Sequence, residues 1–84
     1  MRREDPTIFI LRKLREKNID ENSILSKKAI FRFLNVILKE VGIYSQASLY
    51  QYFNKLKLEG AIIELEDGNY RINFSKFGFT KEKK

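Results

Sequence analysis

The polar side chains of residues 45–58 are the best placed in this sequence to recognise another molecule. Leu49, Phe53 and Leu56 recur there at helical spacing, which predicts a helix with one face in a core. The outward face carries mostly uncharged hydrogen-bonding groups: Gln46, Ser48, Tyr50, Gln51, Asn54 and Lys55. Amides and hydroxyls pair with base edges and phosphates. Because solvent-facing helices normally carry Glu and Lys there, the pattern indicates a surface that contacts a partner.

Catalysis and metal binding have little chemistry to draw on in this chain. The sequence contains no cysteine and no histidine, which removes thiolate ligands, the commonest metal ligand and the commonest general base. No two carboxylates are placed convincingly for acid–base work. We therefore expect no enzyme activity, no catalytic residues, no metal site and no cofactor. The sequence indicates no small-molecule ligand either.

The balance of charge favours a polyanionic partner. Across 84 residues, 17 Lys and Arg stand against 11 Asp and Glu, which gives a formal net charge of +6. Such a field attracts nucleic acid and supplies salt-dependent affinity for phosphate; solubility alone is the other interpretation of a basic domain. A chain of this length supports one domain with a small core.

Neither a membrane span nor a secretory signal is expected. The apolar runs are far shorter than the roughly 20 residues of a membrane-spanning helix. The first six residues also lack the apolar stretch of a secretory signal. We therefore expect an intracellular, cytoplasmic protein associated with DNA.

A first helix is expected from about Pro6 to Lys17, because Asp5 and Pro6 suit the cap and the first helical position. Its core face is formed by Thr7, Ile10, Leu11 and Leu14. Phe9 falls nearly opposite that face. After this helix, residues 23–25 predict a minimal strand.

A second helix is expected from Lys27 to Val41, with Ser26 as its N-cap. Its apolar positions span an arc of roughly 220°, wider than the stripe that one core face needs. The face that remains is narrow and basic, and consists of Lys28, Arg32, Asn35 and Lys39. Phe31 and Leu38 belong to the apolar arc and are either covered by the first helix or exposed at a contact between two copies.

The chain changes to alternating spacing after the polar helix. Glu59 and Gly60 predict a helix end with glycine in the left-handed conformation. Residues 61–66 and 70–74 then alternate apolar and polar side chains, and Asp67-Gly68 between them predicts a hairpin with a primed turn. We expect a single domain over residues 1–79 and a flexible, lysine-rich tail at residues 80–84.

The order of helix, short strand, helix, tight turn, helix and hairpin is that of an α+β winged helix-turn-helix domain. Within it, a set of residues carries a family resemblance: Ala47, Ser48, Leu49, Tyr50, Phe53, Lys55, Leu56, Glu59, Gly60 and Ile62. They resemble the recognition-helix signature of winged-helix regulators of the PadR, MarR and GntR kind. In those families a small residue and Ser or Thr open the helix, and an acidic-glycine pair leads into the wing. The match covers residues 45–62 and the hairpin pattern; residues 1–44 agree only in element order.

This resemblance implies that the helix 45–58 lies in the major groove of double-stranded DNA. The expected base-edge contacts are Gln46, Ser48, Tyr50 and Gln51. The expected contacts to the DNA backbone are Ser45, Asn54, Lys55, Lys27, Lys28 and Arg71. Tyr50 could instead pack against the second helix. For Tyr52, we expect this packing. Because the front half of the helix has no arginine for a bidentate guanine contact, A·T-rich sites are expected.

Two features depart from those families. The tip of the wing carries Glu64, Glu66 and Asp67, so it is not expected to enter the minor groove. PadR and MarR proteins dimerise through a long terminal helix, and the sequence shows no pattern for one. A homodimer would therefore use Phe9, or Phe31 and Leu38 on the second helix, or the aromatic residues at positions 77 and 79.

We predict a sequence-specific double-stranded DNA-binding protein, a small transcriptional regulator. A plasmid-partition or viral adaptor that binds repeated sites would use the same contacts. A different class stays open, namely a winged-helix protein–protein interaction module of a larger assembly. The acidic wing and the broad apolar arc of the second helix favour that alternative.

Overall fold

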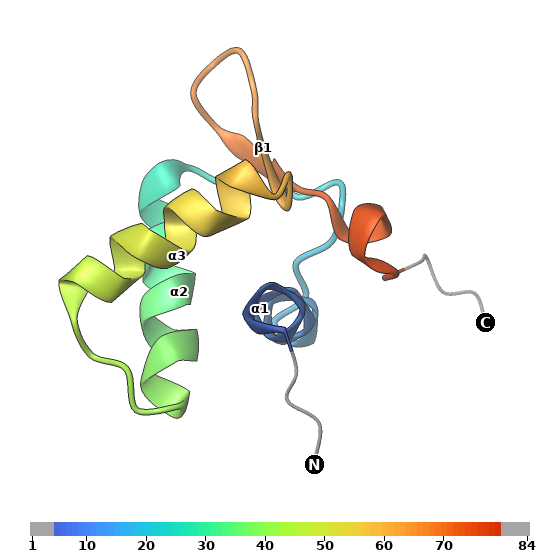
Figure 1. Cartoon of the computed structure of the whole chain (residues 1–84). Helices are drawn as coiled ribbons and strands as arrows, with labels where there is room; N and C mark the ends of the chain where they lie inside the picture. The colour runs from blue at the N-terminus through green and yellow to red at the C-terminus, as the bar shows by residue number, and fades with distance from the viewer. Residues whose placement is uncertain (1–4, 80–84) are drawn as a thin grey trace.

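The computed structural model describes residues 5–79, which form three α-helices followed by a two-stranded antiparallel sheet (Figure 1). The elements are α1 (Pro6–Glu16), α2 (Lys27–Glu40), α3 (Gln46–Leu58), β1 (Ile62–Glu64), β2 (Tyr70–Ile72) and the 3-10 helix η1 (Phe74–Phe77). The α+β class is confirmed, and the layout is consistent with a winged helix. The tail predicted at residues 80–84 lies outside the described residues.

Each of the three α-helices begins at a cap that the sequence predicts. The caps are Asp5, Ser26 and Ser45. Their side-chain oxygens accept hydrogen bonds from backbone N–H groups two or three residues further on, over 2.8 to 3.4 Å. These bonds satisfy N–H groups that have no partner inside the helix. The start of α3, where the candidate contacts lie, is therefore encoded locally.

The end of α3 is fixed by Gly60, as predicted. Gly60 adopts the left-handed conformation, with a φ of +76°. Its N–H donates to the carbonyl of Lys57 over 3.1 Å, and the N–H of Ala61 donates to the carbonyl of Leu56 over 2.8 Å. This pair of bonds is a Schellman motif. Because Ala61 and Leu56 are also buried, the motif directs the chain from the core into β1.

A single apolar core lies between the helices and one face of the sheet. Its buried members are Ile10, Leu11, Leu14, Ile30, Leu34, Ile37, Phe53, Leu56, Ala61, Ile62, Tyr70, Ile72 and Phe74. The helix α2 packs against both α1 and α3, which explains why its apolar arc is wider than one core face requires. Most of that arc is therefore used inside the domain.

Phe31 and Leu38 on α2 were expected to be either covered by α1 or exposed at a contact between two copies. Leu38 is only 2% exposed, so it is not an exposed contact residue. Phe31 is half-buried, and its ring stacks on that of Phe53 with 4.7 Å between centroids. It is thus covered by α3 rather than by α1. The sequence left these outcomes open because helical periodicity does not say which neighbour covers each flank.

The hairpin pairs Ile62 with Ile72 and Glu64 with Tyr70, but its turn differs from the predicted one. The primed-turn prediction is wrong. The N–H of Leu65 donates to the carbonyl of Asn69 over 2.7 Å, which leaves three residues in the turn, and of these only Gly68 has a positive φ. The N–H of Gly68 donates to the carbonyl of Leu65 over 3.0 Å, a pattern typical of such loops. The Asp67 carboxylate accepts the N–H of Asn69 over 3.1 Å, which stabilises this alternative.

The minimal strand predicted at residues 23–25 is reduced to one bridge. Leu25 and Tyr70 exchange both backbone hydrogen bonds, over 2.8 and 2.7 Å. This bridge attaches the segment between α1 and α2 to the free side of β2. It therefore places the sheet beside the start of α2.

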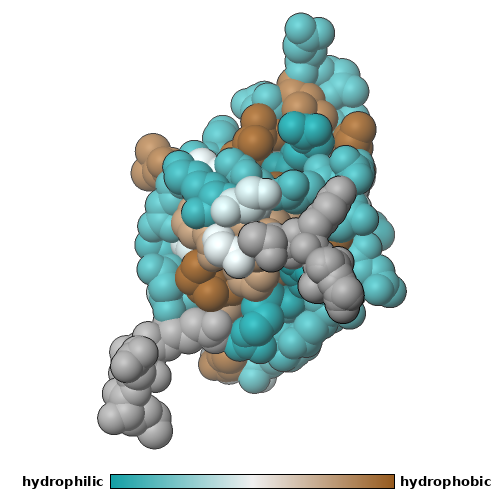
Figure 2. Space-filling view, turned by 90° about the vertical axis from the view of Figure 1, so that its right-hand side faces the viewer, coloured by the Kyte–Doolittle hydropathy of each residue, from teal (hydrophilic) through white to brown (hydrophobic). Residues whose placement is uncertain are grey.

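The surface on the η1 side is mainly hydrophilic, with hydrophobic residues in separate small groups (Figure 2). Scattered apolar exposure of this kind is ordinary for a small domain. None of the helices in residues 5–79 is both long and apolar enough to cross a bilayer.

Candidate nucleic-acid interface

The helix α3 has the two-sided character predicted from its sequence. Phe53 and Leu56 face the core, with 3% and 1% of their surface exposed. On the other side, Gln46, Tyr50, Gln51 and Asn54 are exposed and Ser48 is half-buried. Figure 1 shows α3 lying across α2, with the hairpin projecting from its C-terminal end. Several amides and hydroxyls of α3 are therefore open to a partner.

Tyr50 combines the two interpretations of its sequence position. Its ring lies 5.0 Å from that of Phe31 on α2, at an interplanar angle of 58°. The residue is nevertheless 58% exposed. Contact with Phe31 restricts the ring while leaving much of it accessible, so Tyr50 is a semi-rigid part of the exposed face.

Ser45 and Lys55, two expected backbone contacts, also have structural roles. The hydroxyl oxygen of Ser45 caps α3, which leaves its O–H proton free to donate to a phosphate. Lys55 donates to the Glu59 carboxylate over 2.7 Å, and this hydrogen bond raises the pKa of Lys55. Lys55 therefore stays cationic, and part of its hydrogen-bonding capacity is used within the domain.

Glu59 is an organising residue that sequence reasoning missed. Besides Lys55, its carboxylate accepts a hydrogen bond from the hydroxyl of Thr7 over 2.5 Å. These bonds from Lys55 and Thr7 lower the pKa of Glu59. Thr7 lies in α1 and Glu59 is the C-cap of α3, and no local sequence signal predicts their contact.

A hollow between α2 and the start of α3 joins the basic face of α2 to the polar face of α3. Its lining residues are Lys28, Phe31, Arg32, Asn35, Lys39, Tyr44, Gln46 and Leu49. We call it the α2–α3 hollow. Lys28, Arg32 and Lys39 are exposed, and no ion pair within residues 5–79 involves them. The structure thus brings three cations to the same surface as Gln46.

Arg32, Lys39 and Tyr44 were not among the expected contact residues. The spacing of positions 28, 32, 35 and 39 places the two cations on the same helical face as Lys28, so this signal was present in the sequence. Tyr44 precedes the N-cap of α3, in a turn whose path only the tertiary structure reveals.

The remaining expected backbone contacts are more dispersed. Lys27 is exposed, and its ammonium lies 5.6 Å from the ring centroid of Phe53. Arg71 is exposed on β2, where it pairs across the sheet with Ile63. The structure therefore separates Arg71 on the hairpin from the cations of the α2–α3 hollow.

The tip of the hairpin presents carboxylates to solvent. Glu64, Glu66 and Asp67 are all exposed. Asp67 is engaged by the backbone and side-chain amides of Asn69, over 3.1 and 3.2 Å. None of the three forms an ion pair with another described residue, so the tip repels phosphate.

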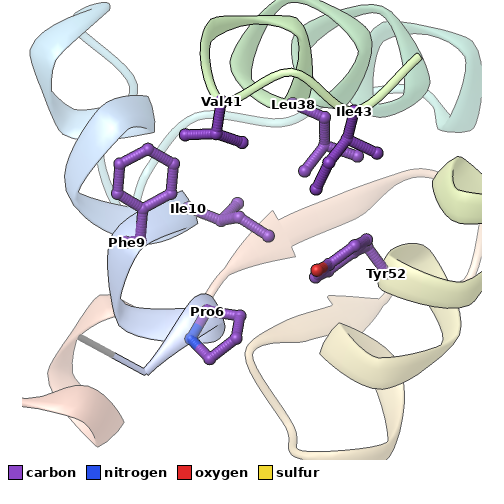
Figure 3. A pocket seen from close by; sticks show the side chains of 7 residues that line it. All are labelled: Pro6, Phe9, Ile10, Leu38, Val41, Ile43 and Tyr52. Carbon is purple, nitrogen blue, oxygen red and sulfur yellow. The ribbon is translucent and has the colours of Figure 1, made fainter. Parts of the chain in front are cut away.

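A second hollow, of about 610 Å³, is apolar and lies between α1, the end of α2 and α3 (Figure 3). It is lined by Pro6, Phe9, Ile10, Leu38, Val41, Ile43 and Tyr52. Phe9 is half-buried, with Arg12 and Lys13 near its ring at 5.5 and 5.7 Å from the centroid. Because no lining side chain is charged, this hollow suits apolar groups rather than phosphates.

The described residues contain no group of three or more carboxylate, histidine or cysteine side chains that could hold a metal ion. Comparisons of this chain with protein-family models, curated proteins and solved structures found no match.

Proposed function

We propose that this chain is a winged helix-turn-helix domain that binds double-stranded DNA sequence-specifically and has no enzymatic activity. One observation carries the proposal: Gln46 of the exposed polar face of α3 lines the same hollow as Lys28, Arg32 and Lys39, which are exposed and form no ion pair with another described residue. Base reading and phosphate binding need these two kinds of groups on one surface. The α3 helix lies in the major groove, and α2 crosses the adjacent phosphate backbone.

Base reading belongs to the exposed side of α3. Gln46 and Gln51 carry amides that pair with the N6 and N7 atoms of adenine in the major groove. Ser48 and Tyr50 add hydroxyls that bind a base edge or a phosphate. Since none of these side chains is a guanidinium, the proposal keeps a preference for A·T-rich sites.

Phosphate binding belongs mainly to α2. From Lys28 to Lys39 the cations extend over about 16 Å of helix, enough to contact more than one phosphate. Lys27, Ser45, Asn54 and Lys55 add groups near α3, and Arg71 adds one on β2. The acidic tip of the hairpin stays out of the minor groove.

In the cell, this activity is that of a small transcriptional regulator located with DNA in the cytoplasm. A plasmid-partition or viral adaptor that binds repeated sites would use the same surface. A homodimer would place two such helices on successive turns of the duplex, and Phe9 and Phe31 are both half-buried, so each retains some exposed surface for such a contact.

The second candidate function is a protein–protein interaction module. The apolar hollow of Figure 3 favours it, because Val41 at its edge is half-exposed. The broad apolar arc of α2 no longer favours it, because most of that arc is in the core. DNA binding accounts for the α3 face and the α2 cations, which the interaction module leaves unused.

The salt dependence of binding tests the proposal. We expect the logarithm of duplex affinity to fall with the logarithm of salt concentration, with a slope of about −0.9 for each phosphate contacted. Removing one contact, by Arg32→Ala or by Lys39→Ala, should make the slope shallower by about 0.9. Absence of duplex binding at low salt, or slopes that neither substitution changes, would contradict it.

A further inference from the structure

The α2–α3 hollow has a composition that goes beyond what duplex binding requires. It is a shallow, open hollow of about 470 Å³. Two aromatic rings, two side-chain amides and three cations line it. A nucleotide offers a ring face, a polar base edge and a phosphate, which are the groups that these three kinds of side chain recognise. We propose that this hollow binds an unpaired nucleotide of single-stranded DNA.

The aromatic part of the site is formed by Tyr44 and Phe31. Tyr44 occupies the position before the N-cap of α3, where an apolar residue commonly packs against the fourth helical residue, here Leu49. Both residues line the hollow, but Tyr44 leaves 70% of its surface exposed. Phe31 is fixed by its stacking on Phe53 at an interplanar angle of 27°. One wall is therefore rigid, and the other offers an accessible ring on which a base can stack.

The polar part of the site is formed by Asn35 and Gln46. Each side-chain amide offers two N–H donors and one carbonyl acceptor, which match the donors and acceptors of an unpaired base edge. Asn35 is half-buried on α2, and Gln46 is exposed at the first position of α3. They come from different helices, and both line the hollow.

The cations supply the phosphate contacts. Lys28, Arg32 and Lys39 are exposed and lie on the α2 side of the hollow. No carboxylate is among the lining residues. A strand whose base stacks on the exposed ring of Tyr44 can therefore run its backbone along α2, as basic grooves with aromatic platforms bind single strands.

The partner is an unpaired strand rather than a duplex, because base pairs in a duplex are stacked on their neighbours. A ring face reaches Tyr44 only after unstacking, which costs a few kcal/mol in a duplex and least in a single strand. This inference does not rest on the proposed duplex binding, although both would use Gln46 and the α2 cations: Tyr44 is assigned to the single strand alone, and Gln51 lies outside the hollow. The two activities can be tested separately.

Fluorescence anisotropy with a labelled oligothymidine tests the inference. We expect Tyr44→Ala to weaken binding of the single strand about tenfold, the loss expected when one stacked base is removed. Tyr44→Phe keeps the ring and should bind within about twofold of the unchanged chain. Glu66→Gln at the exposed tip of the hairpin, outside the hollow, is the control, and it should leave single-strand affinity unchanged.

A second measurement needs no substitution. On the unchanged chain, thymidine monophosphate should shift the nuclear magnetic resonance signals of Tyr44 and Asn35 but not those of Gln51. No shift at Tyr44, or equal oligothymidine affinity for Tyr44→Ala and Tyr44→Phe, would overturn the inference. Tighter binding of an RNA strand with the same dependence on Tyr44 would overturn its assignment to DNA.

The same assays separate this inference from the proposed function. Single-strand binding that depends on Tyr44, without any duplex binding, would refute the proposed function and support the inference. Duplex binding that depends on Gln51, together with single-strand binding that Tyr44→Ala does not weaken, would support the proposed function and refute the inference.

Discussion

The hydroxyl of Thr7 at the start of α1 donates a hydrogen bond to the carboxylate of Glu59 at the end of α3. Lys55 donates to the other oxygen of the same carboxylate over 2.7 Å. Thr7 is only 1% exposed, so the bond to its hydroxyl is shielded from solvent. Glu59 thus ties α3 to α1 and restrains one of the expected DNA contacts.

Replacing Glu59 by Gln should lower the free energy of unfolding by about 1 kcal/mol at neutral pH. This is less than a buried charged pair would contribute, because Glu59 is partly exposed to solvent. Hydrogen bonds from Lys55 and Thr7 lower the pKa of Glu59 in the folded state. Its contribution is therefore complete above the ordinary carboxyl pKa of 4.5 and is lost as the pH falls through the lower, folded value. Urea unfolding across this range measures the effect.

Glu66→Gln on the hairpin tip is the control for that substitution, because Glu66 is exposed and forms no ion pair with another described residue. It should leave both the stability and its pH dependence unchanged. Identical pH profiles for Glu59→Gln and the unchanged chain would refute the role of Glu59.

The bond between the two helices can also be isolated by a double-mutant cycle. Thr7→Val removes the donor while keeping the shape of the side chain. Glu59→Ala removes both acceptor oxygens, whereas Gln would keep one for the Thr7 hydroxyl. Combined, Thr7→Val and Glu59→Ala should be less destabilising than the sum of the single changes by about 0.5 kcal/mol or more. Additive effects in urea unfolding would mean that the two residues do not interact energetically.

Gly60→Ala should cost about 1 to 2 kcal/mol of stability, because residue 60 has a φ of +76° that an L side chain rarely adopts. A Cβ there would also lie 2.7 Å from the Lys76 ammonium nitrogen, but that flexible side chain can move. Adding Lys76→Ala should therefore not restore stability. Full recovery in the double variant would assign the cost to the clash instead.

Single substitutions on α3 should change sequence preference rather than general affinity. Gln46→Ala or Gln51→Ala should reduce discrimination by about 1 to 3 kcal/mol at one base pair. Lys28→Ala and Arg71→Ala should weaken binding to all sequences alike. Competition among duplexes that differ at single positions measures both effects, and a uniform loss in the Gln variants would argue against base reading.

The acidic hairpin tip should have little effect on duplex binding. Glu66→Lys reverses one charge at the tip and should change duplex affinity by no more than about threefold at moderate salt, because screening weakens charges beyond about 10 Å. A gain of tenfold or more would show that the tip approaches the DNA backbone.

Local chemistry made the helix ends predictable. Each capping side chain accepts hydrogen bonds only from residues two or three positions further on, as at Asp5, Ser26 and Ser45. The end of α3 depends on the positive φ of Gly60 itself. The predicted type of hairpin turn was wrong, because the Asp67 carboxylate also accepts a hydrogen bond from the N–H of Asn69. The sequence alone did not show whether this hydrogen bond or the primed turn is more stable. Where the competing interactions are all local, their relative strengths decide the outcome.

Contacts between residues that are distant in the sequence could not be predicted from it. Periodicity placed Leu38 on the apolar arc but did not say that it is buried, and nothing local joins Thr7 to Glu59. Likewise, the polar face of α3 was visible in the sequence, whereas its approach to Tyr44 and Arg32 depends on how α2 and α3 pack. Side-chain types indicated the chemistry, and helix packing brought the residues together.

Selection from random duplex DNA at moderate salt tests most directly whether α3 reads sequence. The proposal predicts enrichment of an A·T-rich motif by the unchanged chain and loss of that enrichment when Gln46 and Gln51 are both replaced by Ala. Recovery of no enriched motif, with only micromolar and salt-labile binding, would contradict sequence-specific recognition.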